Sequence, residues 1–101
     1  HVQFKAYVPG YTGKVNLIKK VVGLPGDSVQ IVSDECFVNQ QKIGGVLAET
    51  KSGEKLYPIE SATVPAGHVF LAGESIRSFD SRYKSMGFVP MSQLGKLYAV
   101  F

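Results

Sequence analysis

Two adjacent lysines, Lys19 and Lys20, lie inside an apolar stretch and are the residues best placed to do chemistry. If the stretch is a β-strand, the two side chains point to opposite faces, and each face also carries apolar neighbours. A lysine in apolar surroundings loses hydration of its charged form, which lowers its pKa. A shift from about 10.4 to roughly 7 requires disfavouring the ammonium by about 4 to 5 kcal/mol, which burial supplies and a surface site does not. A neutral lysine can take a proton from a serine hydroxyl as a general base.

Periodicity leaves two questions open at this pair. It does not distinguish Lys19 from Lys20, and paired lysines on a strand commonly extend their ammonium groups to water instead of reacting. Choosing between the two lysines therefore needs information beyond the alternation of the strand.

The elements around the lysines are predicted to be β-strands joined by turns. Polar and apolar residues alternate over residues 2–8, and Pro25-Gly26 occupies the centre of a type II turn, where proline presets φ and glycine accepts a positive φ. Residues 46–63 are expected to form a long hairpin or excursion, and residues 74–86 an ordered loop. The sequence predicts an all-β fold with strands at residues 2–8, 15–22, 28–32, 36–38, 42–43, 68–73 and 97–101, and a helical turn at 91–94.

Composition favours one small domain over residues 1–101, because 45% of the 101 residues are hydrophobic. The net charge of +3 comes from dispersed lysines and arginines, so nucleic acid is not an expected partner. The single cysteine, Cys36, is expected to be a packing residue. No apolar run is long enough to span a membrane, and a chain that opens on His1 within a strand is expected to be a fragment of a longer protein.

Residues 18–27, Ile-Lys-Lys-Val-Val-Gly-Leu-Pro-Gly-Asp, resemble the motif I-K-R-x-x-G-x-P-G-D of the bacterial signal peptidase I family. In that family the first lysine of the pair is the general base, so the resemblance assigns this role to Lys19. Lys20 keeps the charge of the usual arginine. The turn that follows the catalytic strand in the family is matched by Gly23, Pro25, Gly26 and Asp27.

A second segment, residues 73–82 followed by residues 87–90, resembles the family's later motif G-D-N-R-x-x-S-x-D-S-R, then G-x-V-P. The resemblance implies that Ser78 hydrogen-bonds the lysine and orients it. It also implies that Asp80 and Arg82 pair to hold the loop, with Ser81 in support. If the loop were an exposed polar surface instead, such a pair would contribute little.

The second segment also departs from the usual pattern. Glu74 and Ser75 replace Asp and Asn, and one residue is missing before Ser78. The run of residues 77–83 and the short insert between the two motifs are closer to the conjugative-transfer TraF-type branch, which processes pilin precursors, than to a housekeeping leader peptidase.

The resemblance implies a partly open, barrel-like fold of small antiparallel sheets and a serine endopeptidase activity with a Ser-Lys dyad. The implied substrates are exported precursors or pilins with small residues before the cleavage site. The implied location is the periplasmic side of the bacterial inner membrane, reached through an anchor outside this chain. The resemblance implies no metal or organic cofactor.

The family's S-x-x-P-T nucleophile motif is not in the sequence. We therefore expect the chain to hold the base without the nucleophile and to be inactive in isolation.

Two alternatives stay open from the sequence. One is a LexA-type self-cleaving serine–lysine protease, for which Ala66-Gly67 would be the small-residue bond. In that family, however, the cut precedes the lysine, and residues 64–67 are better explained as a turn before a strand. The other is a peptidase-like module that has lost its serine and serves binding or assembly.

Overall fold

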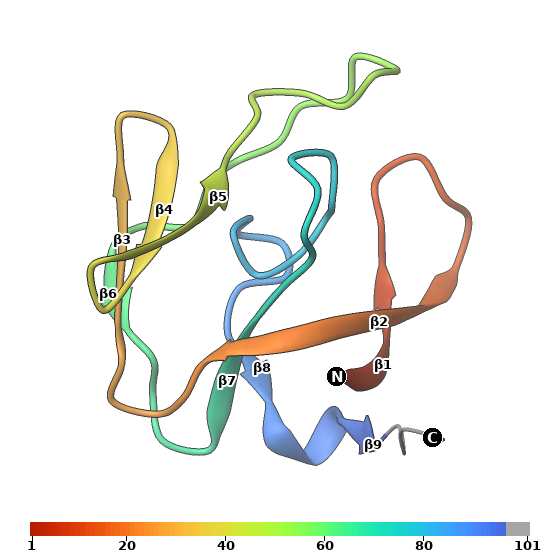
Figure 1. Cartoon of the computed structure of the whole chain (residues 1–101). Helices are drawn as coiled ribbons and strands as arrows, with labels where there is room; N and C mark the ends of the chain where they lie inside the picture. Colours follow the sequence, from red (N-terminus) through yellow and green to blue (C-terminus); the bar gives the residue numbers. More distant parts are fainter. Residues whose placement is uncertain (97–101) are drawn as a thin grey trace.

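The computed structural model describes residues 1–96 and consists of two antiparallel sheets that curl into a partly open barrel (Figure 1). The predicted all-β class is confirmed, and the one helical element is a single 3₁₀ turn within the described residues. The strands are β1 (Val2–Tyr7), β2 (Lys14–Gly23), β3 (Ser28–Val32), β4 (Glu35–Val38), β5 (Gln41–Gly45), β6 (Ala62–Thr63), β7 (His68–Ala72), β8 (Val89–Pro90) and β9 (Gly95–Lys96), and the 3₁₀ turn is η1 (Met91–Gln93).

The ten-residue strand β2 connects the two halves of the larger sheet, whose strand order is β8-β7-β2-β1-β9. Residues 14–19 of β2 pair with β1, and residues 20–23 pair with β7 on the opposite edge. Within residues 1–96, no strand pairs with the β7-side edge of residues 14–19. The first half of β2 therefore presents one open edge, and its last residue, Gly23, lies at a bulge against β7.

The smaller sheet has the strand order β5-β4-β3-β6 and follows β2 directly through the Pro25-Gly26 turn. The predicted type II turn is confirmed, since Gly26 has a φ of 92° and the Asp27 amide donates to the Leu24 carbonyl at 2.9 Å. The next two connections are tight hairpins with positive φ angles at residues 33–34 and 39–40. These hairpins join the strands of the smaller sheet by short turns. The two longest connections of the described chain are residues 46–61 and 73–88.

The segment at residues 46–63, expected to be a hairpin or an excursion, folds back on itself. Glu49 and Lys55 form an isolated antiparallel bridge, and the Leu56 amide donates to the Ala48 carbonyl at 2.9 Å. The segment then continues into β6. Residues 64–67 form the expected turn before β7, with Gly67 at a φ of 75°. The strand predicted at residues 97–101 lies outside the described residues.

Two apolar clusters form the interior. The first lies against the smaller sheet and contains Val29, Cys36, Val38, Val46, Val64, Phe70 and Tyr83. The second, formed by Phe4, Val69, Leu71 and Val89, packs against the larger sheet. Burial raises the pKa of the Cys36 thiol to about 11, so this cysteine is the packing residue that the sequence predicted and carries no reactive thiolate. Within residues 1–96, no helix is both long and apolar enough to cross a bilayer.

Candidate active site

The two lysines of β2 lie in different environments. Their side chains point to opposite faces of the strand, and Lys19 is half-buried while Lys20 is exposed. Burial lowers the pKa of Lys19 below its ordinary value. The charge of Asp80 opposes this effect by raising the pKa, and the charge of Arg82 adds to it. The alternation of the strand could not distinguish Lys19 from Lys20, but the burial of their side chains does.

Lys19 approaches Ser78 at a position where the chain has a glycine. If Gly73 carried a Cβ atom, that atom would lie 2.7 Å from the Ser78 Cβ and 3.1 Å from the Lys19 Nζ. Real side chains do not tolerate the first of these distances, so the space between the strand and the loop exists because residue 73 has no side chain. The fold thus brings Lys19 and Ser78, 59 positions apart in the sequence, close to the same point beside Gly73.

The loop that carries Ser78 is stabilised by a buried ion pair between two of its own residues, Asp80 and Arg82. The side chains of Asp80 and Arg82 are 0% and 1% exposed and are joined at 2.6 Å between Oδ2 and Nη2, and again at 2.8 Å between Oδ1 and Nε. Burial disfavours the Arg82 charge, but the hydrogen bond and the charge of Asp80 hold the pKa of the guanidinium above its ordinary value. Because the pair is bidentate and buried, it fixes the loop far better than an exposed pair of the same residues would.

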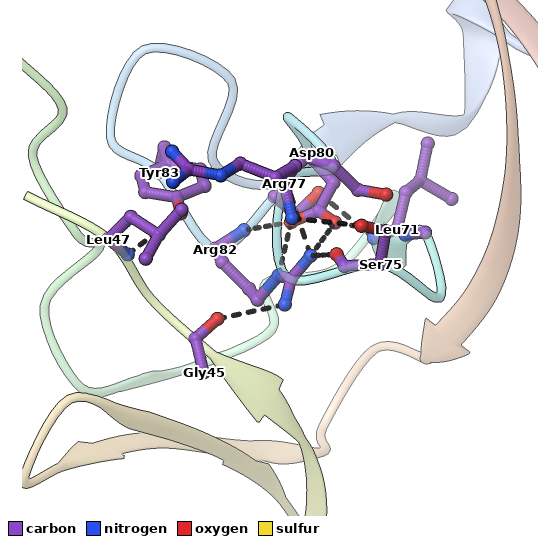
Figure 2. Close-up of polar contacts among 11 residues, drawn as sticks. Gly45, Leu47, Leu71, Ser75, Arg77, Asp80, Arg82 and Tyr83 are labelled. Carbon is purple, nitrogen blue, oxygen red and sulfur yellow. Dashed lines mark hydrogen bonds and ion pairs between the residues drawn. The ribbon is translucent and has the colours of Figure 1, made fainter. Parts of the chain in front are cut away.

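Both residues of the ion pair also form hydrogen bonds with backbone groups (Figure 2). Arg82 donates to the carbonyls of Gly45 at 2.9 Å and Ser75 at 3.0 Å, and the Asp80 carboxylate accepts from the Gly73 amide at 2.9 Å. In the described residues, no buried side-chain nitrogen or oxygen is left without a partner. The network therefore links β5 to Gly73, the glycine beside which Lys19 and Ser78 meet.

Ser81 ties the same loop to β7. Its hydroxyl accepts from the Leu71 amide at 2.9 Å, and its own amide donates to the Leu71 carbonyl at 2.9 Å. β7 in turn pairs with β2. This double contact therefore fixes the position of the loop relative to the strand that carries Lys19.

The turn after β2 is built to end that strand in a fixed direction. Asp27 accepts from the Leu24 amide at 2.8 Å and from the Asn39 side-chain amide at 2.9 Å, and these bonds lower the pKa of its carboxyl. At Gly23 an added Cβ would meet the Phe70 Cβ at 2.8 Å, so glycine is required where β2 approaches β7. These motif residues hold the end of β2 and do not line the cleft beside Lys19.

A cleft of about 720 Å³ opens next to Lys19 and Ser78. Its walls come from the loop between β1 and β2, the 46–58 segment and the Ser78 loop, which all rise from the same side of β2 in Figure 1. Phe79 and Tyr83 stack at 5.6 Å on one wall, and the Tyr83 hydroxyl accepts from the Leu47 amide at 3.0 Å. The floor includes residues 15–17 and 19 of β2, so the cleft runs beside the open edge of that strand.

Comparison with known proteins agrees with this arrangement. The family model for signal peptidase, peptidase S26, matches residues 2–100. The chain belongs to the signal peptidase family. Signal peptidase I of Pseudomonas fluorescens is 35% identical over 80% of this chain and 38% of that protein, and signal peptidase I U of Bacillus subtilis is 34% identical over 66% and 40%. The chain thus spans about two fifths of the length of these curated relatives.

The fold is also that of a signal peptidase. The crystal structure of a signal peptidase I from Enterococcus faecalis superposes with a TM-score of 0.51 at 24% identity, covering 97% of this chain and 93% of that one. The signal-peptidase-type architecture predicted from the sequence is therefore confirmed, including its curled, partly open barrel.

The sequence does not reveal every residue that shapes this candidate site. Gly44 lies under the Arg82 guanidinium, where an added Cβ would meet Nη1 at 2.7 Å. Tyr83 belongs to the run of residues 77–83, but the sequence predicts neither its burial nor its bond to Leu47. A glycine pair at the end of a hairpin was visible in the sequence, but its contact with a residue 38 positions away has no local signal.

Proposed function

We propose that this chain is the base-bearing part of a serine endopeptidase that removes leader peptides from exported precursors, with Lys19 as general base. The observation that carries the proposal is the half-buried Lys19 beside Ser78, on the floor of a cleft and with a lowered pKa. A serine contributed by residues outside this chain would complete the dyad.

In the proposed mechanism, the neutral Lys19 amine accepts the proton of the serine hydroxyl as the serine oxygen attacks the scissile carbonyl carbon. The resulting ammonium then donates that proton to the leaving amine, which releases the mature protein and leaves an acyl-enzyme. Water hydrolyses the ester with the lysine again as base. Ser78 orients the amine, and the Asp80–Arg82 pair with Ser81 holds Ser78 in place.

The precursor is proposed to bind as an added strand along the open edge of β2. Residues 14–19 have no strand partner on that edge within the described chain, and the cleft follows the same edge up to Lys19. An extended chain supplies the missing backbone hydrogen bonds, and it brings its scissile bond to the end of the edge, where Lys19 lies. Small residues before the cut fit the narrow space that Gly73 leaves near the lysine.

The finer assignments rest on the sequence resemblance. A TraF-type role in conjugative transfer, with a pilin as substrate, is supported by residues 77–83 and by the short insert between the motifs. A membrane anchor outside the chain and a periplasmic catalytic domain follow from the same resemblance.

The test substitutes the two lysines separately in the natural full-length protein. We predict that Lys19→Ala lowers processing of a precursor by at least about a hundredfold, because the base is lost. Lys20→Ala should stay within about tenfold of wild type, since its side chain is exposed and outside the cleft.

The outcomes separate the assignments. If Lys20→Ala abolishes processing and Lys19→Ala spares it, the base is wrongly assigned. The isolated 101-residue chain should not cleave the precursor, and serine-dependent cleavage by it would contradict the absence of a nucleophile. A full-length protein without any cleavage would favour the binding-module alternative.

A further inference from the structure

The face of the larger sheet opposite Lys19 is open to solvent and carries lysines. Alternate residues of β1 and β2 point to this face, and the register sets Lys5 opposite Asn16 and Tyr7 opposite Lys14. All four side chains are exposed, Tyr7 to 68%. We refer to these four residues as the lysine face.

Within residues 1–96, no carboxylate forms an ion pair with the lysine face. Residues 1–26 contain four lysines and no aspartate or glutamate, so every acidic residue of the chain follows β2. The ion pairs of the described residues join Lys42 to Glu35, Arg82 to Asp80 and Lys84 to Glu60, and none involves this face. Lys14 Nζ lies 5.5 Å from the centroid of the Tyr7 ring. A surface of one sign attracts ligands of the opposite charge.

The lysine face adjoins a hollow and an unpaired strand edge. The hollow has a volume of about 420 Å³ and is lined by Gln3, Phe4, Lys5, Lys14, Asn16, Gln93 and Gly95. The last strand, β9, pairs with β1 at Val2 and Gln3. Within residues 1–96, no strand pairs with residues 5–7 on that outer edge. Exposed edges of this kind are templates for an additional strand.

We propose that the lysine face and the adjoining edge of β1 bind an acidic, extended segment of a partner protein, which adds as a strand beside residues 4–7. Such a segment supplies backbone donors and acceptors to the edge and to the amide side chains of Gln3 and Asn16. A lipid headgroup does not offer a row of backbone donors and acceptors at the spacing of a strand, so the unpaired edge beside the lysines favours a polypeptide.

The geometry also specifies the pattern of the bound segment. Four residues of β1 span about 13 Å, which matches a segment of four to six residues. Side chains of the added strand would alternate in direction, like those of β1 itself. The residues on the face of Lys5 and Tyr7 would be acidic, and those between them would lie on the side of the buried Phe4 and be apolar.

The test uses the 101-residue chain and a fluorescein-labelled hexapeptide that alternates glutamate and valine. We expect the glutamate peptide to bind, to bind more weakly as salt increases, and to shift the NMR amide signals of residues 5–7. The double variant Lys5→Glu/Lys14→Glu should weaken binding at least about tenfold. The matched control Lys42→Glu/Lys55→Glu makes the same charge change at two exposed lysines outside both the lysine face and the cleft, and should bind like wild type.

Three results would overturn the proposal: no binding of the glutamate peptide, equal binding of a lysine–valine peptide, or equal weakening by the control variant. Vesicles of phosphatidylglycerol and phosphatidylcholine are the second probe. If they bind through Lys5 and Lys14 while the peptide leaves the amide signals of residues 5–7 unchanged, the surface is a lipid site instead. Because the substituted residues, Lys5 and Lys14, lie outside the cleft beside Lys19, none of these outcomes bears on the proposed peptidase activity.

Discussion

At the scale of single residues, the candidate site depends on one missing side chain as much as on the groups present. Gly73 leaves the space in which Lys19 and Ser78 approach each other, and its own amide is fixed by Asp80 at 2.9 Å. The glycine has no positive φ, so its role is to provide room and not an unusual backbone conformation.

We predict that Gly73→Ala displaces the Lys19 ammonium toward water without unfolding the protein. The pKa of Lys19 should rise toward its ordinary value because the burial that lowers it is reduced. The free energy of unfolding should fall by about 1 to 3 kcal/mol, because Ser78 must move to make room for the new Cβ atom. The pKa is measured from the pH dependence of the Lys19 ¹³Cε NMR signal.

Gly13→Ala is the matched control for this variant. Gly13 has a φ of 71° and nothing within 4 Å of an added Cβ, so alanine there strains the backbone without touching the site. We expect it to cost about 1 to 2 kcal/mol in stability and to leave the Lys19 pKa unchanged. A Gly73→Ala protein with a wild-type Lys19 pKa would show that the glycine does not set the distance between Lys19 and Ser78.

At the scale of elements, the ion pair couples strands that are distant in the sequence. Arg82 bonds the end of β5 through the Gly45 carbonyl, while Asp80 bonds the loop after β7. The hairpin of β4 and β5 therefore supports the Ser78 loop, although none of its residues lines the cleft.

Substitution of the two glycines of β5 tests this coupling. We predict that Gly44→Ala pushes Arg82 away from Asp80, because the new Cβ would lie 2.7 Å from Nη1. Moving the Arg82 charge away from Lys19, leaving the Asp80 charge unpaired and loosening the loop that buries the lysine would each raise the Lys19 pKa. Stability should fall by about 1 to 3 kcal/mol. Urea unfolding and the Lys19 NMR titration measure the two effects.

Gly45→Ala makes the same change one residue later. There the added Cβ would lie 3.3 Å from the terminal carbon of Ile76, an exposed side chain that can move aside. We expect this variant to keep the wild-type Lys19 pKa. Equal pKa shifts in both variants would mean that β5 acts through general loosening and not through Arg82.

Local patterns predicted the longer strands of this chain, but not the two-residue strands β6, β8 and β9 or the contacts between elements. Alternation predicted β1, and Pro25-Gly26 predicted the turn between β2 and β3, because each of these signals lies within a few residues. The contrast between Lys19 and Lys20 depends on which face of β2 the Ser78 loop covers, a long-range choice that alternation does not encode. Family resemblance pointed to Lys19, and the burial of its side chain supplies the physical reason.

At the scale of the whole molecule, the lowered pKa of Lys19 must appear in the stability of the fold. Folded protein releases the Lys19 proton at a lower pH than unfolded protein does, where the ordinary value is 10.5. Between the folded pKa and 10.5, the unfolded state binds more protons, so the free energy of unfolding rises with pH through that window. Below the window both states are charged, and folding carries the penalty of burying an ammonium.

We predict that Lys19→Met is more stable than wild type at neutral pH and that this advantage shrinks as the pH approaches 10.5. Methionine keeps roughly the length of the side chain but never carries a charge. Burying it therefore has no cost from a buried ammonium at any pH, whereas wild type has this cost only while Lys19 is protonated. Urea unfolding at a series of pH values measures the difference between the two proteins, in which the other titrating groups cancel. Lys20→Met, at the exposed neighbour, should run parallel to wild type. Parallel curves for Lys19→Met and wild type would show instead that Lys19 is fully hydrated in the folded protein, which would leave it without the neutral amine that a general base requires.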